Sequence, residues 1–244
     1  MTRFVFVHGF TQTGASWAPI TTRLAGDEML TPDLPGHGDR SSVRADLGGS
    51  ADLLVEQCGP ACYVGYSLGA RVCLHAALRH PDAVERLVVL GATGGIDDDA
   101  ERAARRERDE QLAAELEASG DVATFVERWL RAPLFATLTP EAAGVAARLA
   151  NTAGGLASSL RLAGTGTQQP IWDRLATLEM PVLVMAGALD TTFRELAVRL
   201  VAAIGANATL ALIPAAGHAA HLEQPDAFVA LIRETSQSPG PPRT

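Results

Sequence analysis

The chain has 244 residues, of which 47% are apolar and 20% charged, and its formal net charge at pH 7 is −8. This length and composition are typical of one soluble globular domain, with room for an inserted subdomain. The acidic balance argues against nucleic acid and anionic membrane surfaces as the main partner. All 20 basic residues are arginines, so lysine Schiff-base chemistry and a lysine-dependent phosphate loop are also excluded.

Six apolar runs of strand length follow one another along the chain. They are residues 3–7, 28–33, 62–66, 86–91, 181–187 and 208–213. Their nearly continuous hydrophobicity predicts strands that are covered on both faces. Helical patterns lie between them, and this alternation predicts an α/β fold with a doubly wound, mostly parallel sheet. In such sheets the functional site lies at the carboxyl ends of the strands.

Residues 97–165 break the alternation, because they contain only helical or loop patterns. We interpret this stretch as a helical lid inserted into a core formed by residues 1–96 and 166–235. The charge-rich segment that opens it is typical of a solvated helix face. The last residues, 236–244, are rich in proline and polar side chains and are predicted to be disordered.

The three cysteines, Cys58, Cys62 and Cys73, form neither an even set nor a C-x-x-C pair. This pattern is typical of reduced packing residues in a cytosolic protein. No signal peptide and no apolar run of bilayer-spanning length is visible. We therefore expect a cytoplasmic protein, either a monomer or a small homo-oligomer. No His, Cys and Asp cluster has the spacing of metal ligands, so neither metal nor cofactor is expected.

The segment Gly65-Tyr66-Ser67-Leu68-Gly69 matches the pattern G-x-S-x-G between a strand run and a helical pattern. In that context the chain turns so sharply that the flanking glycines are needed to avoid Cβ collisions. The serine hydroxyl then projects above the sheet, beside the start of the next helix. Ser67 is therefore the candidate catalytic serine.

A serine hydroxyl becomes reactive when a histidine base, itself held by a carboxylate, lies next to it. The fold predicts the chain order serine, acid, histidine. Asp190 follows the run 181–187, and His218 follows the run 208–213, so both occupy the expected places. His221 is a rival base, but it begins the final helix and is the better candidate for a structural role.

Charge that develops on a reacting oxygen needs hydrogen-bond donors that are already in place. The backbone N–H of Leu68 is one candidate, because it lies at the start of the helix after the serine. The backbone N–H of Phe10, in the segment VHGF after the first strand run, is the other. His8 of the same segment is expected to support this loop.

Five segments together resemble the α/β-hydrolase superfamily over nearly the whole chain. They are HGFTQTGASW, DLPGHGDRS, GYSLGARV, AGALD and PAAGHAAHLEQP. Four further segments are similar to one branch, the menaquinone-pathway synthases of 2-succinyl-6-hydroxy-2,4-cyclohexadiene-1-carboxylate. They are GYSLGAR, ERAARRERDEQLA, FVERWLRAPLFATL and RLAGTGTQQPIWDRL. The last differs from the expected pattern by one extra polar residue, which leaves the roles of Gln168 and Gln169 open.

This resemblance implies a lyase. The substrate, 2-succinyl-5-enolpyruvyl-6-hydroxy-3-cyclohexene-1-carboxylate, would lose pyruvate by proton abstraction and 2,5-elimination. Ser67, activated by His218 and Asp190, would be the base, and no acyl-enzyme is required. The oxyanion donors would stabilise the enolate-like charge.

The substrate of this branch is a small polycarboxylate, so its site needs fixed cations, and arginine binds carboxylates in a bidentate manner. Arg71 lies one helical turn after Ser67 and can share its side of the helix. The resemblance implies Arg105 of the lid as a second contact, although Arg102, Arg106 and Arg108 are close enough for the register to slip. It also implies that Tyr66 and Trp129 line the pocket.

Two alternatives stay open. The first is a serine hydrolase, a carboxylesterase or carbon–carbon bond hydrolase, with Ser67 as covalent nucleophile. The second is a non-catalytic small-molecule receptor of the same fold. The triad serves elimination and hydrolysis equally well, so it does not discriminate between a lyase and a hydrolase. The arginines favour an anionic substrate. A serine at position 67 argues against the dehalogenases and epoxide hydrolases of this fold, which use aspartate there.

Overall fold

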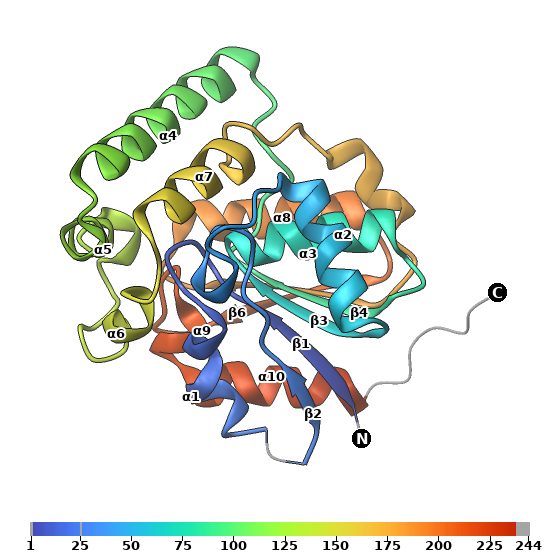
Figure 1. Cartoon of the computed structure of the whole chain (residues 1–244). Helices are drawn as coiled ribbons and strands as arrows, with labels where there is room; N and C mark the ends of the chain where they lie inside the picture. The colour runs from blue at the N-terminus through green and yellow to red at the C-terminus, as the bar shows by residue number, and fades with distance from the viewer. Residues whose placement is uncertain (1, 25, 238–244) are drawn as a thin grey trace.

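A computed structural model describes residues 2–24 and 26–237 and places all six predicted strands in one parallel sheet (Figure 1). The strands are β1 (Arg3–Val7), β2 (Glu28–Leu30), β3 (Ala61–Tyr66), β4 (Val84–Leu90), β5 (Val182–Gly187) and β6 (Ala208–Ile213). Their order across the sheet is β2-β1-β3-β4-β5-β6. The prediction of an α/β fold with a doubly wound parallel sheet is confirmed.

Helices cover both faces of this sheet. One face packs against α2 (Leu47–Cys58), α3 (Leu68–Arg79) and α8 (Thr191–Ile204), and the other against α1 (Ala18–Thr21), α9 (Ala220–Glu223) and α10 (Pro225–Gln237). Side chains of a strand alternate between its faces. In β1, Val5 and Val7 therefore join the core under α2 and α3, while Phe4 and Phe6 join the opposite core.

Four helices lie between β4 and β5, and they gather at one end of the sheet (Figure 1). They are α4 (Asp99–Ser119), α5 (Val122–Leu130), α6 (Val145–Arg148) and α7 (Ala153–Ala163). Three of them, α4, α5 and α7, share a small core of their own, to which α4 contributes Leu116, α5 Phe125 and α7 Leu156. All four fall within the predicted insertion 97–165.

The expectation that every strand is covered on both faces is wrong at the two edges of the sheet. Residues of β2 are half-buried or exposed, and Leu210 and Leu212 of β6 are 39% and 40% exposed. The strand order explains the difference, because an edge strand has one neighbouring strand and less helical cover. The apolar run 28–33 also yields a shorter strand, which ends at Leu30 before Pro32.

Helix α10 continues to Gln237, so the first two residues of the predicted disordered tail 236–244 are helical. The prediction for residues 238–244 lies outside the described residues. Among the described helices, none combines the length and apolarity needed to cross a membrane.

Candidate active site

The sharp turn at Ser67 connects β3 directly to α3. Ser67 adopts φ 52° and ψ −109°, a backbone conformation that is costly for a residue with a side chain. The two motif glycines are required by close approach: a Cβ on Gly65 would lie 2.6 Å from Cα of Ala70, and one on Gly69 would lie 2.1 Å from the carbonyl oxygen of Val7. The motif therefore packs the start of α3 against β1 and β3 while it raises the serine.

Gly69→Ala is expected to lower the free energy of unfolding by about 2–3 kcal/mol, because the added methyl group meets the rigid backbone of β1. Urea unfolding followed by circular dichroism measures this. Gly154→Ala in α7 is the matched control, since the nearest atom to its new Cβ is a guanidinium nitrogen of Arg44 at 3.9 Å. That control should stay within about 1 kcal/mol of wild type. Equal stability of the two variants would contradict the packing account.

Ser67, His218 and Asp190 come together at the carboxyl ends of β3, β5 and β6. His218 Nε2 lies 3.1 Å from Ser67 Oγ, and its Nδ1 lies 3.0 Å from Asp190 Oδ2. The other carboxylate oxygen of Asp190 accepts from the backbone N–H of Phe193 at 3.1 Å, which caps α8 and fixes the carboxylate. This is the arrangement that serine activation requires.

Gly91, directly after β4, leaves room for the imidazole ring of His218 because it has no side chain. It has φ 63°, and a Cβ there would lie 2.8 Å from Cε1 of His218. The ring of Phe193 also packs against the imidazole, with its centroid 4.3 Å from that of His218. The imidazole is thus held by packing as well as by hydrogen bonds.

His221 lies away from Ser67 and is fully buried between the rings of Trp17 and Tyr66, with centroid distances of 4.7 and 4.3 Å. Burial lowers the pKa of His221 well below its ordinary value, followed by smaller effects of Arg148 and His218. The structural role expected for His221 agrees with this position.

The two residues expected to supply oxyanion donors, Phe10 and Leu68, line the pocket that holds Ser67. Leu68 is the first residue of α3, so its N–H has no partner inside the helix. In the loop after β1, the described hydrogen bonds use the N–H groups of Gly9 and Gln12 but not that of Phe10. Phe10, Ser67 and Leu68 all line one pocket, so the N–H groups of Phe10 and Leu68 stay the candidate oxyanion donors.

The lid holds the loop that carries Phe10. Nδ2 of Asn151 donates to the carbonyl oxygen of Thr11 at 2.7 Å, and the buried Arg148 donates to the Thr11 hydroxyl. Thr11 has φ 66°, so these contacts stabilise a backbone conformation that is otherwise unfavourable. Sequence reasoning missed both lid residues, because no motif marks them.

His8 supports the same loop, as expected. Its Nδ1 donates to the carbonyl oxygen of Gly9 at 2.9 Å, and its Nε2 accepts from the backbone N–H of Leu34 at 3.0 Å. Burial lowers the pKa of His8 to about 4 and that of its neighbour His37 to about 3. Both rings are therefore neutral near pH 7.

These two histidines predict acid sensitivity. Because their pKa values in the folded protein lie below the unfolded value of 6.5, the unfolded chain binds more protons as the pH falls below 6.5, and stability is lost toward pH 4. Each contributes about 1.4 kcal/mol per pH unit in that window. His37→Leu should reduce the slope of unfolding free energy between pH 6 and pH 4.5 by about that amount. An unchanged pH dependence of the unfolding free energy, measured by urea titration, would contradict this role of His37.

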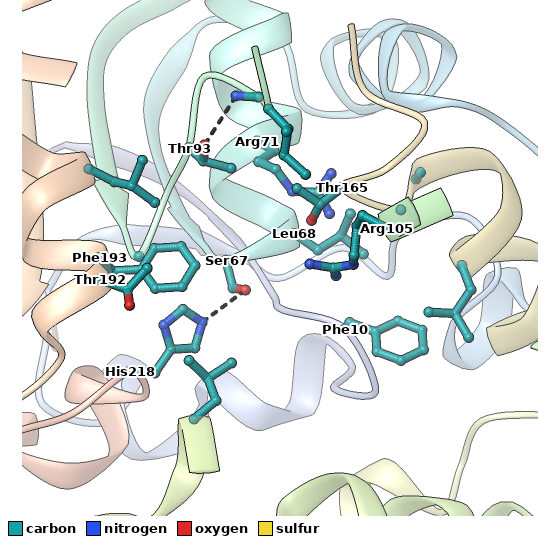
Figure 2. Close-up of a pocket in the computed structure, with 18 of the residues that line it drawn as sticks. Phe10, Ser67, Leu68, Arg71, Thr93, Arg105, Thr165, Thr192, Phe193 and His218 are labelled. Carbon is teal, nitrogen blue, oxygen red and sulfur yellow. Dashed lines mark hydrogen bonds between the residues drawn. The ribbon is translucent and has the colours of Figure 1, made fainter. Parts of the chain in front are cut away.

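The pocket above Ser67 has a volume of about 680 Å³ and lies between the sheet and the lid helices. Figure 2 shows the Ser67 hydroxyl pointing to His218, with the guanidinium of Arg105 and the ring of Phe10 facing the same space. Three arginines are among its lining residues, Arg71, Arg105 and Arg199. Three carboxylates, Asp97, Asp98 and Glu101, line the pocket as well, and Arg71 is the one of the three arginines without an ion pair in the described part of the chain.

Arg71 is the most buried of these cations, with 7% of its surface exposed. Within the described part of the chain it forms no ion pair, and its Nη1 donates to Gln168 Oε1 at 3.3 Å. Burial lowers the pKa of Arg71 to about 10, with a smaller effect of Arg105, so it is charged near pH 7. Gln168, whose role the sequence left open, thus orients Arg71, while Gln169 is exposed.

Arg105 is the lid arginine that reaches the pocket. Arg102 pairs with Asp99, and neither Arg106 nor Arg108 lines the pocket. Of these four arginines, Arg105 is therefore the one that lines the pocket, while its contact with substrate stays a prediction.

The carboxylate of Asp109 holds Arg105. Arg105 Nε donates to Asp109 Oδ1 at 2.9 Å, and the Asp109 side chain is only 2% exposed. The other oxygen of Asp109 accepts from the N–H of Gly166 at 3.4 Å, and a Cβ on Gly164 would lie 2.6 Å from that oxygen. Gly164 of the GTG segment thus makes room for this carboxylate, while Gly166 allows the segment to approach the backbone of α4, where a Cβ would lie 2.2 Å from the nitrogen of Arg106.

Of the two aromatic residues expected in the pocket, Trp129 and Tyr66, only Trp129 is among its lining residues. Trp129 lines it and packs edge-on against Phe10, with ring centroids 5.0 Å apart. Tyr66 is not a lining residue and is 3% exposed, so its predicted place in the pocket is wrong. Strand alternation explains this, because Tyr66 at the end of β3 points into the core on the side of Phe6 and Trp17.

Two findings bear on metals and cysteines. In residues 2–24 and 26–237, no group of three His, Cys, Asp or Glu side chains is placed to hold a metal ion. Cys58, Cys62 and Cys73 are buried and unpaired, and burial raises the pKa of each thiol.

Comparison with known proteins agrees with this geometry. A model of the alpha/beta hydrolase family matches residues 4–231. The 2-succinyl-6-hydroxy-2,4-cyclohexadiene-1-carboxylate synthase of Serratia proteamaculans is 30% identical over 97% of this chain and 93% of its own. The synthase of Salmonella schwarzengrund is 32% identical over 92% of this chain and 90% of its own.

Solved structures give the same picture. MenH from S. aureus has a TM-score of 0.87 at 28% identity, over 96% of this chain and 92% of that chain. An esterase from Thermogutta terrifontis has a TM-score of 0.84 at 22% identity, a likeness that shows the fold alone. The chain therefore belongs to the alpha/beta hydrolase family, and within it is an enzyme of the MenH type.

Proposed function

We propose that this enzyme eliminates pyruvate from 2-succinyl-5-enolpyruvyl-6-hydroxy-3-cyclohexene-1-carboxylate and thereby serves menaquinone biosynthesis. The observation that carries the proposal is Arg71, a buried guanidinium that faces the pocket without an ion-pair partner in the described chain. A buried cation is unfavourable unless an anion completes its environment. A substrate carboxylate supplies that anion, and the relatives named as synthases support the same assignment.

Ser67 acts as the base in the proposed reaction. Its Oγ takes the proton from C2 of the ring while its own proton moves to Nε2 of His218, which Asp190 orients. The C2 electron pair forms the C2=C3 bond, the C3=C4 bond shifts to C4=C5, and the C5–O bond breaks. The enolpyruvate that leaves takes up a proton and becomes pyruvate. The N–H groups of Phe10 and Leu68 stabilise the enolate-like oxygen in between.

The alternative is ester or carbon–carbon bond hydrolysis with Ser67 as nucleophile, since the same three side chains serve it. A neutral ester would leave Arg71 without an anion, whereas a polycarboxylate satisfies both Arg71 and Arg105. The expected partner is thus a small polycarboxylate. The absence of nucleic-acid and membrane partners and of cofactors, the cytoplasmic location and the oligomeric state stay predictions.

Formation of the conjugated diene tests the proposal. The purified enzyme is mixed with the enolpyruvyl substrate, and diene absorbance is followed together with pyruvate, measured with lactate dehydrogenase. Equal amounts of diene and pyruvate are expected. Saturable binding of the substrate without either product would instead support the receptor alternative.

Asp109→Asn is expected to raise KM about 10-fold with a smaller change in kcat, because Arg105 loses the carboxylate that orients it. Glu110→Gln, the next residue of α4, is the matched control, since the exposed Glu110 pairs with Arg161 and does not line the pocket. If Asp109 acts through Arg105, the double variant Asp109→Asn with Arg105→Gln should have the same KM as Arg105→Gln alone. Additive losses would contradict that link.

A further inference from the structure

A third arginine, Arg199 of α8, faces the pocket at its rim. It lines the same pocket as Arg71 and Arg105. Its side chain is 48% exposed, in contrast to the deeply buried Arg71. No motif of the sequence marks it, and neither the triad nor the oxyanion donors use it. Its place is that of a cation that a ligand meets near the pocket entrance.

The ring of Trp172 fixes the orientation of this guanidinium. Arg199 Cζ lies 3.7 Å from the centroid of the Trp172 ring, which is a close stacking contact. The indole is itself held, because it is 7% exposed and its N–H donates to the carbonyl oxygen of Gly95 at 3.0 Å. A stacked guanidinium keeps its N–H groups free at its edge, where they can bind a carboxylate.

A carboxylate already occupies that edge. Nη1 of Arg199 donates to Oδ2 of Asp97 at 2.6 Å, and the Asp97 side chain is 54% exposed. Asp97 lies in the segment that leads from β4 into α4 and also lines the pocket. An ion pair this exposed contributes only about 0–1 kcal/mol, so a substrate carboxylate can replace Asp97 at little cost.

We propose that Arg199 is a third contact for a substrate carboxylate, at the rim of the pocket, with Asp97 as the exchangeable partner that occupies it in the free enzyme. The inference rests on the proposed function, whose substrate carries three carboxylates, one on the ring, one on the succinyl arm and one on the enolpyruvyl arm. The buried Arg71 and the half-buried Arg105 bind two of them, and Arg199 binds the third. Arg199 is thus a specificity residue for anionic substrates with a carboxylate on an outer arm.

Arg199→Gln is expected to raise KM for pyruvate release about 5- to 10-fold and to change kcat less than about 2-fold. Arg128→Gln is the matched control. Arg128 pairs with Glu115 at 2.8 Å with similarly exposed side chains and lies over the ring of Phe125, yet it does not line this pocket. Its KM should equal that of wild type. An unchanged KM in Arg199→Gln would overturn the proposal.

Asp97→Asn separates a binding role from a merely structural ion pair. If the ion pair only connects the lid to α8, removal of either partner should change KM in the same direction. If Asp97 competes with substrate, Asp97→Asn should lower KM, the opposite of Arg199→Gln. In the Arg199→Gln background the same change should have no effect, because the competition is gone. A rise in KM for Asp97→Asn would overturn the proposal.

A binding measurement distinguishes failure of this inference from failure of the proposed function. Calorimetric titration with tricarballylate, a small tricarboxylate, needs no turnover. Wild type should bind it about 5- to 10-fold more tightly than Arg199→Gln, while glutarate, a dicarboxylate, should show a smaller difference. If this holds but no pyruvate is released, the proposed reaction is wrong and the anion contact stands. Equal affinity for tricarballylate, or none in either protein, would overturn the contact itself.

Discussion

Ser67→Ala is expected to lower kcat for pyruvate release about 10³-fold, because the reaction loses the base that removes the ring proton. His218 Nε2 lies 3.1 Å from Ser67 Oγ and has no other hydrogen-bond partner among the described residues. The imidazole is held by Asp190, Gly91 and Phe193, so it cannot simply move into the vacant space. KM should change little, since the arginines are untouched. Initial rates with the lactate dehydrogenase coupled assay give both constants.

Ser50→Ala is the control for this variant, because Ser50 is a buried serine of α2 that does not line the pocket. Its rate should be that of wild type. In His218→Ala, kcat should fall about as much as in Ser67→Ala. In the double variant it should fall little further, because the two residues act as one unit. If Ser67→Ala kept most of the activity, the base would have to be sought elsewhere.

Arg71→Leu is expected to lower kcat/KM about 100-fold, most of it through KM, since it removes a desolvated charge that binds a substrate carboxylate. The free energy of unfolding should not fall with it. The buried guanidinium has only Gln168 as described hydrogen-bond partner, and its removal relieves a desolvation cost. Loss of activity without loss of stability is the expected signature of a binding residue.

Arg131→Leu serves as the control for Arg71→Leu, because Arg131 is an exposed lid arginine paired with Glu127 and lies outside the pocket. Arg71→Lys should recover only part of the activity, since lysine offers a point charge in place of a planar fork. Parallel losses of activity and stability in Arg71→Leu would instead indicate a structural residue.

The order of the sheet elements could be predicted because each strand is an apolar run of the right length between helical patterns. The predictions that failed concern the helical cover of the edge strands and the end of α10. Leu210 and Leu212 look as buried as the residues of β3, and only the strand order reveals that β6 is an edge. The boundary of α10 at Gln237 was missed because the polar composition of the tail begins before the helix ends.

In the site, Ser67, Asp190 and His218 could be identified because strand ends and chain order fix them. Tyr66 was misplaced because its neighbour is the serine, while strand alternation directs its side chain to the opposite core. Asp109, Arg148 and Arg199 also contact residues far away in the sequence, at Gly166, Thr11 and Trp172. No local pattern announces such contacts, so only the folded chain reveals them.

The most direct test of the account compares two reactions of one enzyme preparation. The kcat/KM for pyruvate release from the enolpyruvyl substrate is measured beside that for hydrolysis of p-nitrophenyl acetate, a neutral ester. The account predicts that kcat/KM for pyruvate release is at least about 10³-fold higher, because only the anionic substrate engages the pocket arginines Arg71 and Arg105. Ready hydrolysis of the ester without release of pyruvate would contradict it.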